Sequence, residues 1–302
     1  MKNFDSSYHR SVLLNETIDN LKINPDGIYI DCTVGGAGHS SEIVKHLSSA
    51  GRFIGIDQDS DAIDEAYKKF SNLNPICHVN LIQKNFSSLQ EILNELQIYS
   101  VDGILFDLGI SSHQIDTAER GFSYMQNAPL DMRMNQSQNL SALDIVNFYS
   151  EENLTRIFFD YGEERWSKRI AKFICDMRRE KKFQTTFDLV DAICRAIPKA
   201  VRQKDPHGSE KRIFQAIRIE VNSELKILEQ SFETAINALK SGGRICIISF
   251  HSLEDRIVKN SIKKFSTEKK IKRIGKFFAP SEDEILENPR SKSAKLRVAE
   301  KI

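Results

Sequence analysis

The chain has 302 residues, of which 40% are hydrophobic and 28% are charged, a balance typical of a soluble globular protein. No apolar run approaches the ~20 residues that a membrane-spanning helix needs, and the first ten residues lack the apolar core of a secretory signal. Because the formal net charge is only +1, any binding of nucleic acid must come from a local patch. The length is about twice the ~150-residue guide for one domain, so we expect one large or two medium domains.

The five cysteines are an odd number, are scattered along the chain and include no C-x-x-C pair. This pattern argues against a disulfide framework and against a zinc site, and it suits a reducing cytoplasm. We therefore expect a cytoplasmic protein without a metal and without a membrane partner.

From residue 27 to about 112, strand patterns and helix patterns alternate along the chain. We expect strands at 27–33, 52–57, 79–86 and 101–111, and helices at 39–51, 60–73 and 87–100. Ser60 is the expected N-cap of the second of these helices. The alternation predicts an α/β fold with a doubly wound, mostly parallel sheet.

The alternation then stops, and residues 115–210 contain helix patterns almost without strands. After them, 211–239 is a helical pattern long enough for two helices, and 240–250 is expected to be another buried strand. We therefore expect a discontinuous α/β core of 1–114 and 211–302, interrupted by a helical insert on the substrate side at 115–210.

A glycine-rich turn, "DCTVGGAGHS" at residues 31–40, connects the first expected strand to the first expected helix. The dinucleotide pattern G-x-G-x-x-G fails whether it is counted from Gly35 or from Gly36, and no Gly-Lys-Ser/Thr ending follows. Asp57 ends the second strand 22 positions after Gly35, the spacing at which an acid can accept hydrogen bonds from ribose hydroxyls. These features favour an adenosine ligand that has no pyrophosphate, although an ordinary tight turn remains an alternative.

S-adenosyl-L-methionine is such a ligand, because it carries a sulfonium cation and no phosphate. Carboxylates at the ends of three expected strands, Asp31, Asp57 and Asp107, would suit the cation. Backbone N–H groups at the start of the following helix would suit its carboxylate.

Seven segments, in order over nearly the whole chain, resemble the bacterial 16S ribosomal RNA cytosine-N4 methyltransferases. They are "HRSVLLNE" (9–16), "DCTVGGAGHS" (31–40), "GIDQD" (55–59), "DLGISSHQID" (107–116), "ERGFSYMQNAPLDMRM" (119–134), "SFHSLEDRIVK" (249–259) and "NPRSKSAKLR" (288–297). The resemblance implies an S-adenosylmethionine-dependent enzyme with a Rossmann-like core and a helical insert. It also implies methylation of N4 of one cytidine near the decoding centre, with small-subunit ribosomal RNA or the assembled small subunit as the partner.

The resemblance also assigns cofactor contacts, position by position. Matching residues are the turn residues Ala37, Gly38 and His39 beside Gly35 and Gly36, together with Asp57, Phe86, Asp107 and Gln114. Asp107, at the end of the fourth strand, could instead accept a proton from the substrate.

Two further catalytic candidates have structural alternatives. Asp131, with Arg133, could face the target base or form a structural ion pair; the neighbouring methionines are expected to be packing residues. His251 could lie beside the target base, whereas Ser252 and Asp255 fit a helix capping box. Without the resemblance, His9 is expected to be a surface or capping histidine.

Cations gather at 165–183, 269–278 and 290–297. In the first two runs they are interleaved with Trp166, Phe277 and Phe278, a composition that suits phosphate contact and base stacking. The first run can equally be a solvated helix face, whereas the extended, serine-containing last run is harder to explain in that way. The RNA-binding candidates are Arg165, Lys168, Arg169, Arg290, Lys292, Lys295 and Arg297.

Two other functions remain open at this point. One is a methyltransferase of the same fold that acts on another substrate, and the other is a non-catalytic RNA- or ribosome-binding module. An NAD-dependent oxidoreductase is disfavoured by the failed glycine pattern.

Overall fold

The computed structural model describes residues 11–302. Contacts divide the chain into an α/β unit, made of the residues up to Gly109 together with Leu225–Ile302, and a helical unit, Ile110–Glu224. Our expected insert, 115–210, lies inside the helical unit. The second boundary differs most, because the helical pattern at 211–239 is broken by Ser223, whose φ of 52° is left-handed. The helix before this break, α11 (Gly208–Asn222), belongs to the helical unit, and most of the one after it, α12 (Glu224–Ala238), to the α/β unit.

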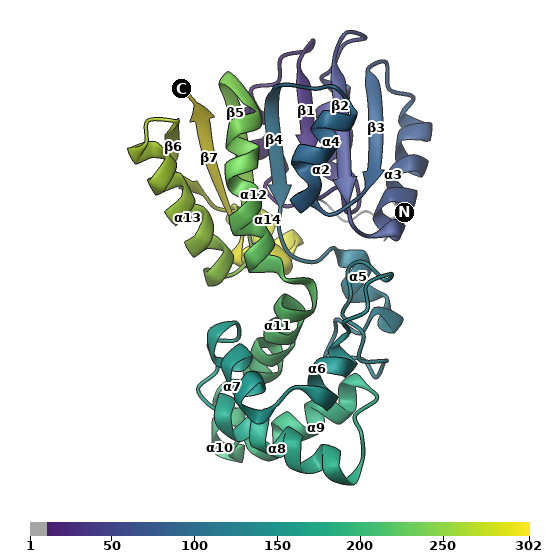
Figure 1. Cartoon of the computed structure of the whole chain (residues 1–302), viewed down its shortest axis with the longest axis vertical. Helices are drawn as coiled ribbons and strands as arrows, with labels where there is room; N and C mark the ends of the chain where they lie inside the picture. The colour runs from purple at the N-terminus through teal and green to yellow at the C-terminus, as the bar shows by residue number, and fades with distance from the viewer. Residues whose placement is uncertain (1–10) are drawn as a thin grey trace. The chain divides into compact units, whose positions relative to one another are not determined.

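Among the described residues, seven strands form one sheet in the order β3-β2-β1-β4-β5-β7-β6 (Figure 1). The strands are β1 (Ile28–Asp31), β2 (Arg52–Asp57), β3 (His78–Gln83), β4 (Val101–Asp107), β5 (Leu239–Ser249), β6 (Ile271–Phe278) and β7 (Lys295–Lys301). The first five pair in parallel, and β7 is antiparallel to both β5 and β6. The expected doubly wound, mostly parallel sheet is therefore confirmed.

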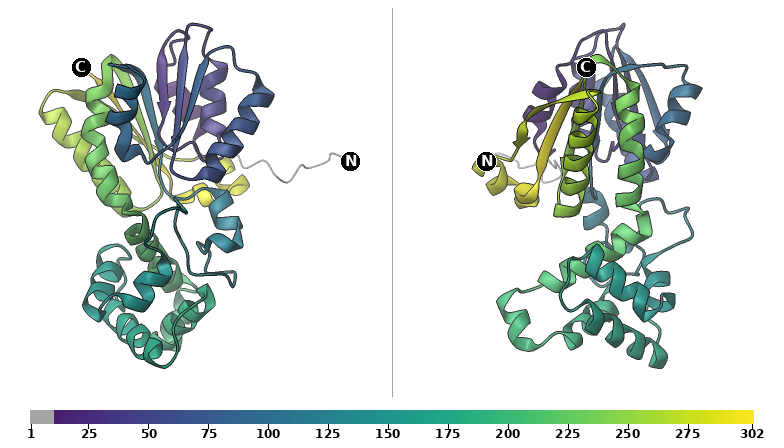
Figure 2. Two further views of the ribbon diagram at one scale, coloured as in Figure 1. Left: turned by 45° about the vertical axis from the view of Figure 1, so that its right-hand side comes forward. Right: turned by 60° about the vertical axis from the view of Figure 1, so that its left-hand side comes forward.

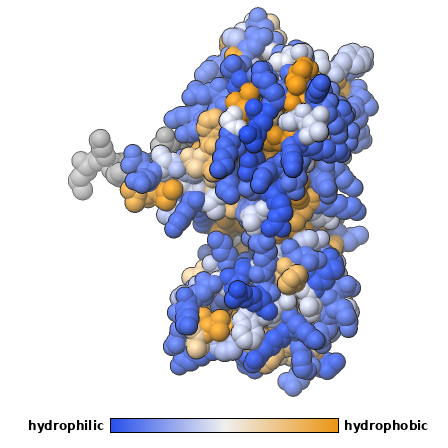
Figure 3. All heavy atoms as spheres, turned by 90° about the vertical axis from the view of Figure 1, so that its left-hand side faces the viewer, coloured by the Kyte–Doolittle hydropathy of each residue, from blue (hydrophilic) through white to orange (hydrophobic). Residues whose placement is uncertain are grey.

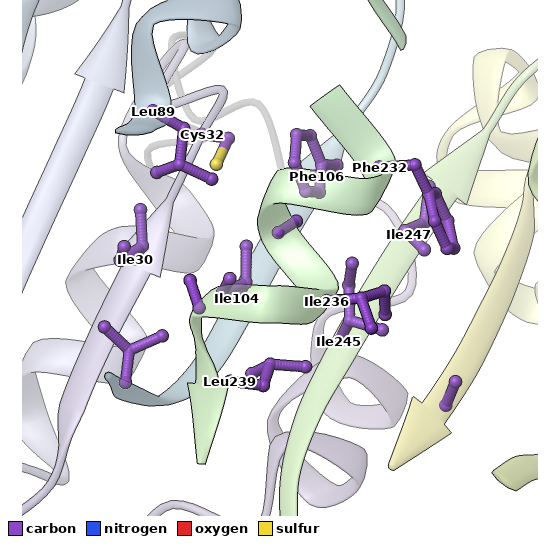
Figure 4. Packing of buried hydrophobic residues seen from close by; sticks show 14 of the residues in the cluster. Ile30, Cys32, Leu89, Ile104, Phe106, Phe232, Ile236, Leu239, Ile245 and Ile247 are labelled. Atoms are coloured by element: carbon purple, nitrogen blue, oxygen red, sulfur yellow. The ribbon is translucent and has the colours of Figure 1, made fainter. Parts of the chain in front are cut away.

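Helices cover both faces of this sheet (Figure 2). Besides α12 they are α1 (Leu14–Leu21), α2 (Gly38–Lys45), α3 (Ser60–Leu73), α4 (Leu89–Glu95), α13 (Ser252–Thr267) and α14 (Glu282–Glu287), with short 3-10 turns η1 (Phe86–Ser88) and η3 (Pro289–Ser293). Strands buried on both sides are apolar at consecutive positions rather than at alternate ones. In β5, Ile245 and Ile247 pack toward α12 and α13, whereas Cys246 and Ile248 belong to the cluster that includes α1 and α2. Figure 4 shows the first of these clusters, with Phe106 and Phe232 close to Ile247.

Two helix N-cap residues differ from those expected, in both cases by one position. Asp59, not Ser60, caps α3, because its carboxylate accepts the backbone N–H of Asp61 at 3.1 Å. His251, not Ser252, caps α13, and it forms the capping box with Glu254. A carboxylate or an imidazole nitrogen accepts the same orphan N–H that a serine hydroxyl would, so the residue type alone did not distinguish the two positions.

The helical unit contains 3-10 turn η2 and seven helices within the described residues. They are α5 (Ser112–Asp116), η2 (Ala118–Arg120), α6 (Ala142–Phe148), α7 (Glu151–Asp160), α8 (Ser167–Glu180), α9 (Thr186–Ala196), α10 (Lys199–Lys204) and α11. Met132 and Met134 are buried in its core, so the expectation that they are packing residues is confirmed. In neither unit does a described helix combine the length and the apolar character that a membrane span requires.

Candidate active site

The glycine turn connects the carboxyl end of β1 to the start of α2. Gly35 has a φ of 48°, which glycine adopts at little cost, and Ala37 has a φ of 55° at the N-cap of α2. A Cβ added to Gly36 would meet no atom within 4 Å, so the backbone of the turn borders open space there. The Nζ of Lys69 donates a hydrogen bond to the carbonyl of Gly36 at 2.6 Å and holds the turn from the α3 side. The turn thus offers bare backbone to a ligand.

Asp57, at the end of β2, closes this turn. Its Oδ2 accepts the backbone N–H of Gly35 at 2.8 Å, and its Oδ1 accepts that of Asp59 at 2.9 Å. Burial raises the pKa of Asp57 to about 6, although both hydrogen bonds act in the opposite direction. Each carboxylate oxygen has a second lone pair, so Asp57 can still accept hydrogen bonds from a ligand.

His39 and Asp107 form a buried pair beside the turn. The Nε2 of His39 is 3.0 Å from the carbonyl oxygen of Val12, and its Nδ1 is 3.4 Å from Oδ2 of Asp107. Burial would lower the pKa of His39, but the hydrogen bond and negative charge of Asp107, with the charge of Asp31, raise it overall. The other oxygen of Asp107, Oδ1, is buried and has no hydrogen-bond partner among the described residues. A buried acceptor without a partner costs free energy that a ligand donor would recover, so the site fits a ligand carrying a donor.

Asp31 has a structural role in the turn that the sequence did not predict. Its Oδ2 accepts the hydroxyl of Ser40 at 2.6 Å, and its Oδ1 accepts the backbone N–H of Thr33 at 3.1 Å. Burial raises the pKa of Asp31, against the hydrogen bond from Ser40. Asp31 therefore ties the two ends of the turn together.

Sequence reasoning missed two hydroxyl residues of this site, Thr33 and Ser40. The Thr33 hydroxyl accepts the backbone N–H of Asp107 at 2.6 Å and so links β4 to the turn. The only available signal was their presence inside the glycine-rich segment, which is weak because serine and threonine are common in turns.

Phe86 and Gln114 are the two cofactor candidates outside the turn and the strand ends. Phe86 begins η1 and packs edge-on against Phe106, with 5.3 Å between ring centroids. Gln114 belongs to the helical unit, where it is buried and completes a capping box with Ser111 at the start of α5. Both remain predicted cofactor contacts.

The two other catalytic candidates are held within their own units. Both carboxylate oxygens of Asp131 accept from the guanidinium of Arg133, at 2.9 and 2.7 Å, so the structure contains the ion pair that was one of our two alternatives. His251 caps α13, with its Nε2 3.1 Å from Oε1 of Glu254. A role beside the target base stays a prediction for both residues. His9 lies outside the described residues.

The RNA-binding candidates fall into two groups by exposure. Those that are exposed are Arg165, Lys168, Arg169, Arg290 and Lys292. Arg169 also lies over the rings of Trp166 and Phe173, at 5.8 and 5.6 Å from their centroids.

Lys295 and Arg297 donate hydrogen bonds to a carboxylate of the protein itself. The Nε and Nη2 of Arg297 donate to the carboxylate of Asp255 at 2.6 and 3.1 Å, and Lys295 donates to the same carboxylate at 3.2 Å. Arg297 is only 8% exposed. This geometry disfavours the predicted RNA contact of Arg297, because a phosphate would have to compete with Asp255 for a buried guanidinium.

The sheet order, the glycine turn after β1 and the acids ending β2 and β4 define a class: the Rossmann-like methyltransferases. The same fold occurs in the solved structure of PH0851, which matches the whole of this chain and 50% of that protein at 12% sequence identity and a TM-score of 0.50. The family model described as "MraW methylase family" matches residues 6–302, and the chain belongs to that family.

Two curated relatives are similar over almost their whole lengths. The "Ribosomal RNA small subunit methyltransferase H" of Clostridioides difficile strain 630 is 53% identical over 311 residues, covering 98% of this chain and 99% of the relative. The protein of the same description in Ruminiclostridium cellulolyticum is 49% identical, covering 97% of this chain and 99% of the relative.

Proposed function

We propose that the chain transfers the methyl group of S-adenosyl-L-methionine to the N4 amine of a cytidine in small-subunit ribosomal RNA. The observation that carries this proposal is the similarity to small-subunit ribosomal RNA methyltransferases over 98% of the chain. The N4 position and the cytidine follow from the resemblance of the seven sequence segments. An enzyme acting on the small subunit works where ribosomes are, so a cytoplasmic location is part of the same proposal.

The unpartnered Oδ1 of Asp107 and the open backbone at Gly36 support binding of the methyl donor in this site. Bound there, S-adenosyl-L-methionine supplies an electrophilic methyl group on a positively charged sulfur. Asp57 would accept from its ribose hydroxyls, and the N–H groups at the start of α2 would hold its carboxylate. The carboxylates of Asp57 and Asp107 would also stabilise its positive charge.

The cytosine amine needs positioning more than it needs a strong base. Its lone pair is delocalised into the ring, and its proton becomes acidic only as the new bond forms, so orientation and a nearby acceptor can supply most of the catalysis. Many amino-methyltransferases carry an Asp/Asn-Pro-Pro-aromatic segment after the fourth strand, and this chain has "DLGIS" at 107–111 instead. Of the three catalytic candidates, Asp107 has the most available acceptor, because Asp131 is bound by Arg133 and His251 caps α13.

Methyl transfer from labelled donor tests the proposal directly. We expect label in small-subunit particles or in naked small-subunit RNA, recovered as N4-methylcytidine by nucleoside mass spectrometry. Comparing the two RNA substrates decides which of them the enzyme uses. Label only in protein or in free nucleosides would contradict the substrate.

The non-catalytic alternative is tested in the cell and in the calorimeter. Deletion of the gene should remove one N4-methylcytidine from the small-subunit RNA, and re-expression of the wild type should restore it. Retention of that methyl group, together with no measurable affinity for the donor, would favour a binding module.

A further inference from the structure

Positive charge is concentrated in one part of the α/β unit. The segment from Ser252 to Phe278, which contains α13 and β6, has nine lysines and arginines and three acids, whereas the whole chain has a net charge of +1. Two of the acids, Glu254 and Asp255, are largely buried and bond inside the protein. The third, Glu268, is paired with Lys270 at 2.9 Å. The acids of the segment therefore do not neutralise its surface.

Several of the cations are exposed and have no ion pair among the described residues. Lys272 is paired with Glu300 at 2.8 Å, so it is not one of them. Those without such a pair are Lys259, Lys263, Lys264, Lys269, Arg273 and Lys276. The ammonium of Lys264 lies 5.1 Å from the centroid of the Phe265 ring. We call Lys259, Lys263, Arg273 and Lys276 the α13–β6 cations.

Three of the α13–β6 cations, Lys259, Lys263 and Arg273, lie along the line where α13 packs beside the edge strand. Lys276 follows on β6, within the register shift between Ile274 and Phe278. Asp255 faces β7, since it binds Arg297, and Lys259 and Lys263 follow it at four-residue spacing on the same stripe of α13. On β6, Ile271 packs in the core cluster that includes α13, and Arg273 points to the same face two residues later. Figure 3 turns this side of the molecule to the viewer, and hydrophilic side chains predominate on it.

Protection of an edge strand accounts for only part of this charge. Lysines on an edge strand prevent pairing with other chains, and β6 is an edge strand. That explanation covers Lys272 and Lys276, but it does not cover Lys259 and Lys263, which are on a helix.

Exposed cations without ion pairs are suited to binding the phosphate backbone of a nucleic acid. On α13 (Ser252–Thr267), Lys259 and Lys263 are four residues apart, which corresponds to about 6 Å along the helix axis. No large hydrophobic side chain of the segment 252–278 is exposed, and the ring of Phe277 is covered by Lys276, Lys295 and Arg297 at 5.7–5.8 Å. Base stacking therefore has no platform here, which favours phosphates over splayed bases.

The distance across the sheet places these cations away from the glycine turn. β6 is four strands from β1, which corresponds to about 19 Å. We infer that the α13–β6 cations bind the phosphate backbone of a helical RNA segment flanking the target nucleotide. This inference rests on the proposed function, because it takes ribosomal RNA as the substrate.

The test uses two matched triple variants of the full chain. The first is Lys259→Gln, Lys263→Gln and Lys276→Gln. The control is Lys22→Gln, Lys68→Gln and Lys226→Gln, three exposed lysines elsewhere in the α/β unit. Each variant removes three positive charges, and the free energy of unfolding and the affinity for the methyl donor are measured for both.

The binding readout is the dependence of the RNA dissociation constant on salt. Each lost phosphate contact on a duplex lowers the slope of log K against log salt by about 0.9, so we expect a decrease of about 2–3 for the first variant and almost none for the control. In methyl transfer to small-subunit RNA, we expect a higher KM at an unchanged kcat. Equal slopes in the two variants would overturn the inference.

Two further arms separate the alternatives. If the same three lysines govern binding to vesicles of phosphatidylglycerol but not binding to RNA, the partner is an anionic membrane surface and the inference is wrong. If the wild type binds RNA with the expected slope but leaves cytidine unmethylated, the proposed function fails while the α13–β6 cations keep their role.

Discussion

Acidic residues lie in two regions of the α/β unit, and these regions differ in the hydrogen-bond donors that they offer to the carboxylates. At the β7–α13 contact, Asp255 receives hydrogen bonds from Arg297 and Lys295, which lower its pKa although burial acts to raise it. At the carboxyl ends of β2 and β4, Asp57 and Asp107 receive no hydrogen bond from a described lysine or arginine, and burial raises the pKa of Asp57 to about 6. The comparison teaches that the Asp255 carboxylate is saturated by cations and holds the β7–α13 contact, whereas Asp57 and Asp107 at the site keep lone pairs available for a ligand.

Removing the Arg297 guanidinium, which binds Asp255, should cause the largest change, a loss in the free energy of unfolding. Arg297→Met leaves Asp255 buried without its bidentate partner, and we expect a loss of about 3 kcal/mol in the free energy of unfolding, measured by urea denaturation. The double variant with Asp255→Leu should recover part of this loss, because it removes the stranded charge as well. A loss below about 1 kcal/mol in the single variant would break the comparison.

Asp57→Ala should weaken binding of the methyl donor, with a smaller change in free energy than that expected for Arg297→Met. The donor's ribose hydroxyls lose a charged acceptor, so we expect its affinity to fall by about 1–3 kcal/mol in calorimetry. Asp57→Asn, which keeps one acceptor, should lose less. Unchanged affinity in the alanine variant would make Asp57 a purely structural residue of the turn.

The raised pKa of Asp57 predicts a dependence of donor affinity on pH. Below about pH 6 the carboxyl is protonated and loses its charge, so affinity should fall by up to about tenfold per pH unit and stay flat above pH 7. For an acid whose pKa is raised by folding, lower pH increases the free energy of unfolding through that group. The loss of affinity therefore cannot come from destabilisation by the same residue. In Asp57→Asn this inflection should disappear, and its persistence would assign it to His39 or Asp31.

The smallest change in stability is expected in the helical unit, where Asp131, like Asp255, is bound by a guanidinium. Asp131→Asn weakens a half-buried bidentate pair with Arg133, so we expect a loss of about 1 kcal/mol in stability and methyl transfer within about twofold of wild type. A large fall in kcat at unchanged stability would instead place Asp131 at the target base.

Periodicity predicted the parallel part of the sheet well because those strands are buried on both faces. β2 and α3 have the bounds expected from the sequence, since the apolar run "RFIGID" and the amphipathic run after it are unambiguous. β6 was not expected, because "IKRIGKFF" is an edge strand rich in lysine, and its identity as a strand depends on pairing with β7. The short helix α1 was also missed.

For the site, spacing predicted Asp57 and strand-end position predicted Asp107; the structure places both beside the glycine turn, and their contacts with the cofactor stay predictions. The roles of Asp31 and Arg297 depend on contacts between residues far apart in sequence, so composition could not separate a buried ion pair from an exposed basic tail. Arg297, for example, meets Asp255 across 42 positions of chain.

The pairing of β4 with β5 joins Val101–Asp107 to a strand that begins at Leu239. During synthesis the helical unit, Ile110–Glu224, is therefore complete before β5, the second partner of β4 after β1, leaves the ribosome. The last strand, β7, begins at Lys295, 56 residues after the start of β5. The contiguous helical unit can fold early, while one edge of β4 stays unpaired until β5, which begins at Leu239, has been synthesised. Translation pauses between residues 110 and 240 would prolong that wait and increase aggregation through the unpaired edge.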